Sequence, residues 1–106
     1  MITIDDFRKL ELKVARIKEA ADHPNADRLY VLTVELPDKT KQIVAGIKKF
    51  YTKEELVGRL VVIVDNLEPA VLRGVESQGM LLAASDETAI AVLSPDKPVA
   101  LDSIVK

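Results

Sequence analysis

Strict alternation over residues 30–36 constrains the fold of this chain more than any other feature of its sequence. Every second residue is large and apolar, namely Tyr30, Leu32, Val34 and Leu36. A period of two is typical of a β-strand that buries one face and exposes the other. Turn residues follow at 37–39, and the apolar run over 42–47 then predicts a return strand. The whole segment therefore predicts a β-hairpin.

Three other segments have the length and composition of short strands. They are rich in apolar residues and bounded by turn residues, which predicts strands over 10–20, 60–64 and 79–84. In the first of them the apolar face changes near Ala15 or Arg16, as a β-bulge or a strong coil of the strand would cause.

Two threonines each precede an acidic residue by three positions, which is the spacing of a helix-capping box. Thr3 with Asp6 predicts a short helix through about Lys9. Thr52 with Glu55 predicts a second short helix, located between the third and fourth strands.

Five strands with a helix between the third and fourth have the element order of an OB-fold. We therefore predict an all-β protein, an OB-fold five-stranded Greek-key barrel with short helices, over about 10–85. An open α+β sheet is the alternative.

Residues 86–106 hold two further apolar runs, 89–93 and 99–105, which a five-stranded barrel does not need. They predict a C-terminal β extension that either caps the barrel or pairs with a second copy, because exposed strand edges and apolar patches favour association.

The length of 106 residues fits one domain, which we expect to span 1–106. Hydrophobic residues make up 48% and charged residues 30%, which is typical of globular rather than disordered proteins. No apolar run approaches the roughly 20 residues that span a bilayer, and the N-terminus has no signal-peptide pattern. These features predict a cytoplasmic protein without a membrane partner.

Residues suited to catalysis or metal binding form no recognisable pattern. The lone histidine, His23, has no partner spacing for a triad or a zinc site, and cysteine is absent. The four glycines do not form a nucleotide-binding loop. We therefore predict no catalytic residue, no metal site and no cofactor, and we interpret His23 as a turn residue.

Charge is distributed unevenly along the chain. The net charge is −2, yet residues 1–60 hold 12 basic and 10 acidic side chains (+2), whereas 61–106 hold 3 and 7 (−4). A local basic patch attracts phosphates within a Debye length whatever the net charge. The basic residues that a barrel could gather on one face are Arg28, Lys39, Lys41, Lys48 and Lys49. Solvated loop lysines are the alternative.

Aromatic residues make up only 4% of the chain, which argues against a stacking platform for single strands. An RNA ligand would instead be recognised through its backbone and shape.

Four motifs occur in a fixed order: HPNADRLY at 23–30, IVAGI at 43–47, NLEP at 66–69 and RGVESQGMLLAA at 73–84. Together they resemble the tRNA-binding domain found at the C-terminus of many methionyl-tRNA synthetases, in endothelial-monocyte-activating polypeptide and as free-standing tRNA-binding proteins. The resemblance implies an OB-fold, often homodimeric through the region after the barrel, that binds tRNA by shape with little regard to sequence.

The resemblance also implies that Arg73, Ser77 and Met80 lie at the RNA-facing end of the last barrel strand, with Asn66 beside them. Their chemistry agrees, because a guanidinium matches a phosphate, a short hydroxyl can bond a phosphate or ribose, and a thioether suits a sugar or base face. The alternatives are an ion pair between Arg73 and Glu76 and a core position for Met80.

The chain departs from the family pattern at Glu68 and Val71, in a stretch where lysines are common. Fewer cations there would weaken RNA binding or shift it toward other basic residues. The full set of predicted tRNA-binding residues is Arg16, Arg28, Lys41, Lys48, Asn66, Arg73, Ser77 and Met80.

The leading hypothesis is a non-catalytic, structure-specific tRNA-binding module that raises the tRNA affinity of a methionyl-tRNA synthetase, as an appended domain or a separate subunit. Its expected partners are tRNA, the synthetase catalytic subunit or domain, and a second copy of the chain. Two alternatives are a dimeric protein-export chaperone of the same fold and a domain that mainly dimerises a synthetase.

Overall fold

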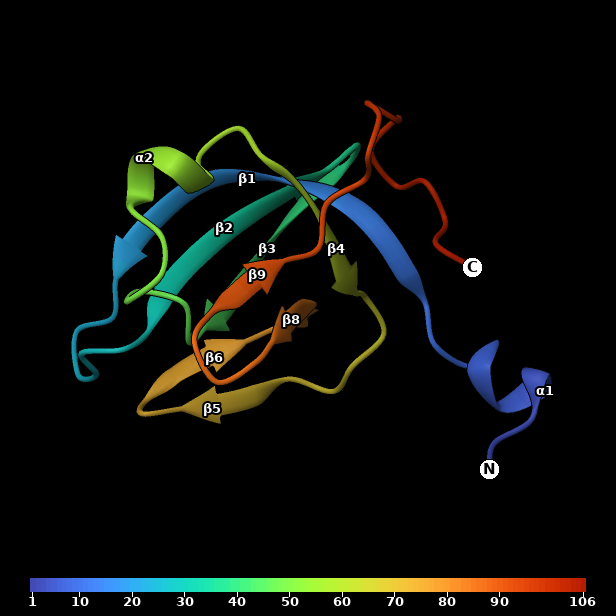
Figure 1. Ribbon diagram of the computed structural model, residues 1–106, viewed down its shortest axis with the longest axis horizontal. Helices are drawn as coiled ribbons and strands as arrows, with labels where there is room; N and C mark the ends of the chain where they lie inside the picture. Colours follow the sequence, from blue (N-terminus) through green and yellow to red (C-terminus); the bar gives the residue numbers. More distant parts are fainter.

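The computed structural model describes residues 1–106 as a strongly curved antiparallel sheet with two short helices (Figure 1). The sheet has five strands in the order β3-β2-β1-β4-β7. Their bounds are β1 Leu12–Asp22, β2 Tyr30–Leu36, β3 Lys39–Ala45, β4 Leu60–Val64 and β7 Met80–Leu81. The predicted all-β class with a five-stranded, barrel-like sheet is confirmed.

The predicted hairpin forms from β2 and β3. Its register pairs Tyr30 with Ala45 and Leu36 with Lys39 around a turn at residues 37 and 38. The alternation in β2 is confirmed, because its apolar positions are all buried. The partner strand begins at Lys39, three residues earlier than predicted.

Strand β1 changes partners along its length. Its first part, 12–16, pairs with β4, and its second part, 16–22, pairs with β2. The register with β2 shifts between Ile17 and Glu19, as in a β-bulge. The predicted bulge therefore exists, slightly later than the expected Ala15 or Arg16, and it lets one strand curve around the core.

Both capping boxes are present. In α1 (Ile4–Phe7) the Thr3 hydroxyl accepts from the Asp6 N–H at 3.1 Å, and the Asp6 carboxylate accepts from the Thr3 N–H at 3.0 Å. In α2 (Lys53–Leu56) Thr52 and Glu55 make the same reciprocal pair. With four residues each, the helices are too short to cover a sheet, so the alternative of an open α+β sheet is wrong.

The core lies inside the curved sheet. Its largest fully buried side chains are Ile17, Leu32, Val34, Ile43, Leu56, Val61 and Ile63. Leu56 comes from α2 and joins the strand residues in a single cluster. Each such side chain stabilises the fold by roughly 1.5–3 kcal/mol through removal from water.

The segment after β4 differs from the prediction of one strand over 79–84. A small hairpin comes first, made of β5 (Ala70–Leu72) and β6 (Val75–Ser77). Arg73 and Gly74 both have positive φ, 53° and 88°, which is the backbone that a tight two-residue hairpin turn requires. Only β7 then joins the main sheet as a strand. The Leu82 N–H still donates to Val62 O at 3.0 Å, and β8 (Ala83–Ser85) then pairs with β9 (Ile90–Val92).

The C-terminal residues 99–105 do not form the predicted strand. They make one isolated bridge, between Ile104 and Lys13, and the adjacent backbone bonds from Val14 N–H to Ser103 O and from Val105 N–H to Leu12 O. Asp102 interrupts any longer ladder because its φ is 73°. The segment covers the part of β1 that β2 leaves free, so the chain's own C-terminus protects that edge.

Candidate functional site

His23 anchors the tip of the β5–β6 hairpin. The residue is 5% exposed, its Nε2 lies 2.9 Å from Leu72 O, and its Nδ1 accepts from the Asn25 N–H at 2.9 Å. Since Nδ1 accepts, Nε2 carries the proton and donates to the Leu72 carbonyl. The Asn25 side chain adds a second tie, donating to Arg73 O at 3.1 Å. His23 is therefore more than the turn residue that the sequence predicts, because it spans to a hairpin 49 residues away.

The hairpin tip presents Arg73 to solvent. The residue is exposed and makes no ion pair. The alternative pairing with Glu76 does not occur, since that carboxylate accepts from Gln78 Nε2 at 3.2 Å. The guanidinium is thus free to bind an anion, while its backbone is held in place by Asn25.

The loop that carries His23 also positions Arg28. The backbone N–H of Lys48 donates to Arg28 O at 3.4 Å, so the β1–β2 loop lies against the segment after β3. Figure 1 shows this loop, the hairpin tip and the segment before α2 at one end of the molecule, opposite α1 and the C-terminus. We call this end, with Arg28, Lys48, Lys49 and Arg73, the loop end. Arg28 has no ion pair, whereas Lys48 Nζ lies 3.2 Å from Asp22 Oδ1.

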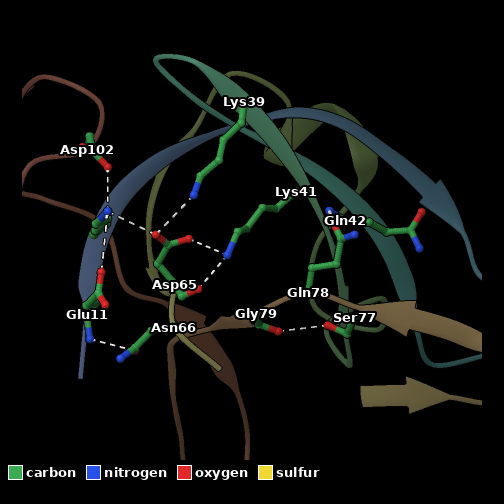
Figure 2. Close-up of polar contacts among 11 residues, drawn as sticks. Glu11, Lys39, Lys41, Gln42, Asp65, Asn66, Ser77, Gln78, Gly79 and Asp102 are labelled. Carbon is green, nitrogen blue, oxygen red and sulfur yellow. Dashed lines mark hydrogen bonds and ion pairs between the residues drawn. The ribbon is translucent and has the colours of Figure 1, made fainter. Parts of the chain in front are cut away.

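Lys41 lies away from the loop end, in an ionic cluster around Asp65 (Figure 2). The Asp65 side chain is 6% exposed, and its Oδ1 lies 2.6 Å from Lys41 Nζ. Lys13 Nζ lies 3.1 Å and Lys39 Nζ 3.6 Å from its Oδ2. Lys41 also donates to the Asp65 backbone carbonyl at 2.6 Å, which turns its ammonium inward.

The cluster shifts the pKa of Asp65 and of Lys13. Burial raises the pKa of Asp65, but hydrogen bonds from Lys41 and Lys13 and the nearby ammonium charges outweigh it, so the net pKa lies below its ordinary value. Hydrogen bonds to Asp65, and then to Asp102, raise the pKa of Lys13. Lys41 and Lys13 are therefore already paired with carboxylates of the chain itself.

Asn66 ties the N-terminal segment to the end of β4. Its Oδ1 accepts from the Glu11 N–H at 2.9 Å, and its Nδ2 donates to Lys9 O at 2.7 Å. These bonds place it near Asp65 (Figure 2) rather than beside Arg73, as the resemblance implied.

Ser77 lies in the seam where the free edge of β3 meets residues 77–79. It is 5% exposed, and its Oγ accepts from the Val44 N–H at 3.0 Å and donates to Gly79 O at 2.9 Å. Gln42 and Gln78 continue the seam: the Gln78 N–H donates to Gln42 O at 2.7 Å, and the Gln42 N–H donates to the Gln78 Oε1 at 2.9 Å. The serine hydroxyl thus replaces a strand-to-strand bond and is turned away from solvent.

Arg16 and Met80 occupy two further places. Arg16 lies in the middle of β1, half-exposed, with a guanidinium nitrogen 3.7 Å from Glu35 Oε1 on the neighbouring strand. Met80 is 47% exposed, so its alternative core position is wrong. It borders an apolar groove of about 340 Å³ together with Ile47, Leu81 and Ile90.

Of the eight predicted binding residues, the structure brings together Arg28, Lys48 and Arg73. Their contact with RNA stays a prediction. The remaining five are spread over the barrel end around Asp65, the seam, the middle of the sheet and the apolar groove. The sequence reasoning missed His23 and Asn25 as the anchors of the hairpin. The HPN motif places the two side chains close together, but it does not indicate which segment they bond, because that segment lies 48 or 49 residues further along the chain.

Neither helix is long or apolar enough to cross a lipid bilayer. No group of three or more His, Cys, Asp or Glu side chains is placed to hold a metal ion.

Comparison with known proteins identifies the family of this arrangement. A family model described as "Putative tRNA binding domain" matches residues 12–102. The methionine–tRNA ligase of Thermococcus kodakarensis is 57% identical over 105 residues, which cover 99% of this chain but 14% of that enzyme. A MetRS related protein from Pyrococcus horikoshii has a similar structure, with a TM-score of 0.93 and 32% identity over 100% of this chain and 98% of that one. The chaperone CsaA from Bacillus anthracis superposes with a TM-score of 0.90 at 25% identity, over 100% and 99% of the two chains.

Proposed function

The chain belongs to the tRNA-binding domain family, and from this premise we propose that it is a non-catalytic, structure-specific tRNA-binding module. In this role it raises the tRNA affinity of a methionyl-tRNA synthetase, as an appended domain or as a separate subunit. The chain spans about one seventh of the matched ligase. We therefore assign it the binding of tRNA and leave aminoacylation to a catalytic partner.

The observation that carries this proposal is the free guanidinium of Arg73 on an anchored hairpin tip, at the same end as Arg28 and Lys48. Such cations act on phosphates within about 10 Å at ordinary salt, so a net charge of −2 does not prevent binding. Anchoring matters because a guanidinium held in position loses less conformational freedom on binding.

The eight candidate residues take different roles in this proposal. Arg28, Lys48 and Arg73 contact phosphates, and Met80 and Arg16 contact the RNA at its periphery. Lys41, Asn66 and Ser77 position the surrounding strands and loops, because their polar atoms are occupied within the chain.

A titration with folded tRNA at several salt concentrations tests the proposal. Each phosphate neutralised on a duplex contributes roughly −0.9 to the slope of log K against log salt, so three contacts give about −2.7. Replacing Arg28, Lys48 or Arg73 with Gln should each reduce the slope by about 0.9. Lys97→Gln is a matched control, because Lys97 is an exposed lysine outside the loop end. A slope near zero, or equal affinity for unstructured RNA, would contradict the proposal.

We further propose that the chain forms a homodimer through its C-terminal part. Leu93, Val99 and Ile104 are exposed apolar side chains after the main sheet, and Ile104 is 73% exposed. Apolar patches of this kind favour association. Light scattering should give twice the mass of the 11.7 kDa chain, and Ile104→Asp should return it to one chain.

The apolar groove beside Met80 favours one second candidate, a chaperone that holds unfolded segments. Eight of its ten lining residues are hydrophobic, and the CsaA fold is similar over the whole chain. Competition separates the two functions: an unfolded polypeptide should displace tRNA from a chaperone but leave it on a tRNA-binding module.

A further inference from the structure

A second concave surface adjoins the loop end. It is an open cleft of about 450 Å³ between the end of β3 and α2. The lining residues are Tyr30, Lys48, Lys49, Phe50, Tyr51, Thr52, Lys53, Glu54 and Glu55. Lys48 and Lys49 belong both to this lining and to the loop end, so the two surfaces share these cations.

The three aromatic rings in the cleft have different roles. The Tyr30 hydroxyl donates to Tyr51 O at 2.7 Å, and the Tyr51 hydroxyl accepts from the Val92 N–H at 2.9 Å. The Arg59 guanidinium also lies 5.3 Å from the centroid of the Tyr51 ring. Both tyrosines therefore hold the loop against the barrel.

Phe50 has no such structural partner. The residue is 42% exposed. The loop that presents it is tightly turned, because the backbone N–H groups of Phe50 and Tyr51 both donate to Ile47 O, at 2.9 and 3.2 Å. A flat apolar ring is thus held at the surface by a defined backbone.

Three lysines, Lys48, Lys49 and Lys53, line the cleft together with this ring. Lys49 is exposed and makes no ion pair. Lys48 and Lys53 share a single carboxylate, each with Nζ 3.2 Å from an oxygen of Asp22. Glu54 and Glu55 also line the cleft. Lys49 is the one lysine of the lining without a carboxylate partner, so an anionic group entering the cleft is drawn toward Lys49.

We propose that this cleft binds one unpaired nucleotide of the RNA, with its base stacked on Phe50 and its phosphate next to Lys49. The inference rests on the proposed tRNA binding and adds a single-stranded contact to it. Unpaired bases are the parts of RNA that proteins read by stacking on aromatic rings. The scarcity of aromatic residues argues against a platform for a long single strand, but one ring is sufficient for one nucleotide.

Affinity for folded tRNA, measured with Phe50→Leu, Phe50→Trp and Lys49→Gln, tests this subsite. The Phe50→Leu variant loses the stacking of one base, so it should bind tRNA about fivefold or more weakly than the wild type. The salt slope should not change, because stacking releases no counterions. Phe50→Trp should retain or increase the affinity. Lys49→Gln should lower the affinity and reduce the slope by about 0.7, the value for a single-stranded phosphate.

A nuclease specific for single strands locates the contact. The wild-type protein should protect an unpaired stretch of the tRNA that Phe50→Leu leaves open. Equal affinity and equal protection for wild type and Phe50→Leu would overturn the subsite while leaving the proposed function intact. Failure of the wild-type chain to bind tRNA with a salt-dependent affinity would instead overturn the proposed function. Because Phe50 is partly exposed, thermal unfolding should show nearly unchanged stability for these variants, which separates loss of contact from loss of fold.

Discussion

Asn25 holds the backbone of Arg73 from 48 residues away, through a hydrogen bond of 3.1 Å from its side-chain amide to the Arg73 carbonyl. Arg73 has a φ of 53°, a conformation that costs energy for residues other than glycine. The bond therefore stabilises a strained turn, and the Arg73 side chain at this turn is a cation of the loop end that makes no ion pair. Local strain and an exposed charge coincide at this position, which supports a binding role for the hairpin tip.

Replacing Asn25 with Ala should weaken tRNA binding through Arg73 rather than by a contact of its own. We expect a loss of about threefold, and no further loss when Asn25→Ala is added to Arg73→Gln. A double-mutant cycle of tRNA affinity measures this coupling. Asn66→Ala is the matched control, because Asn66 is an exposed asparagine that ties two segments away from the loop end. Additive effects of Asn25→Ala and Arg73→Gln would show that the two residues act independently.

Asp65→Asn should destabilise the protein by about 2–3 kcal/mol. The substitution leaves three ammonium groups converging on a neutral amide, and removing one partner of a buried ion pair is costly. The value is reduced from that of a fully buried pair because the lysines reach solvent. Urea denaturation gives the free energy of unfolding. Asp102→Asn, which removes a half-exposed partner of Lys13, should cost less than about 1 kcal/mol.

The ionic cluster also predicts two limits of stability with pH. The folded-state pKa of Asp65 lies below its ordinary value of 3.8, so its contribution is complete above that pH and is lost as the pH falls through the lowered pKa. The folded-state pKa of Lys13 lies above 10.5, so its contribution is complete below that pH and is lost as the pH rises through the raised pKa. Denaturation midpoints measured against pH should therefore decline at both ends. In Asp65→Asn both declines should be weaker, and an unchanged profile would contradict the cluster's role.

The elements that depend on local sequence were predictable. Alternation over β2 and the two capping boxes concern residues within a few positions of one another, and all three occur as expected. The strand over 79–84 and the C-terminal strand were wrong for a shared reason. An apolar run indicates that a segment is buried or paired, but not with which partner. Here residues 83–85 pair with β9, and residues 99–105 make a single bridge with β1.

The candidate site was less predictable than the fold because side-chain type does not reveal which charges are already paired. Lys41 and Lys48 are both lysines near strand ends in the sequence. Only the structure shows that Lys41 is paired with the buried Asp65, whereas Lys48 lies at the loop end and is paired with the half-exposed Asp22. Arg73 was identified through the motif around it, whereas its anchors, His23 and Asn25, required the long-range contact.

Ser77→Ala distinguishes a seam residue from an RNA contact. The substitution leaves the buried Val44 N–H without its acceptor, which should lower the free energy of unfolding by about 1–3 kcal/mol. The salt slope of tRNA binding should stay unchanged, because the hydroxyl is turned into the barrel and neutralises no phosphate. Chemical denaturation and a salt titration on the same variant provide the two readouts. Ser85→Ala is the control, since Ser85 is exposed and should change stability by no more than about 0.5 kcal/mol. A variant with normal stability but weakened tRNA binding would instead mean that the Ser77 hydroxyl contacts the RNA, and that the seam opens when tRNA binds.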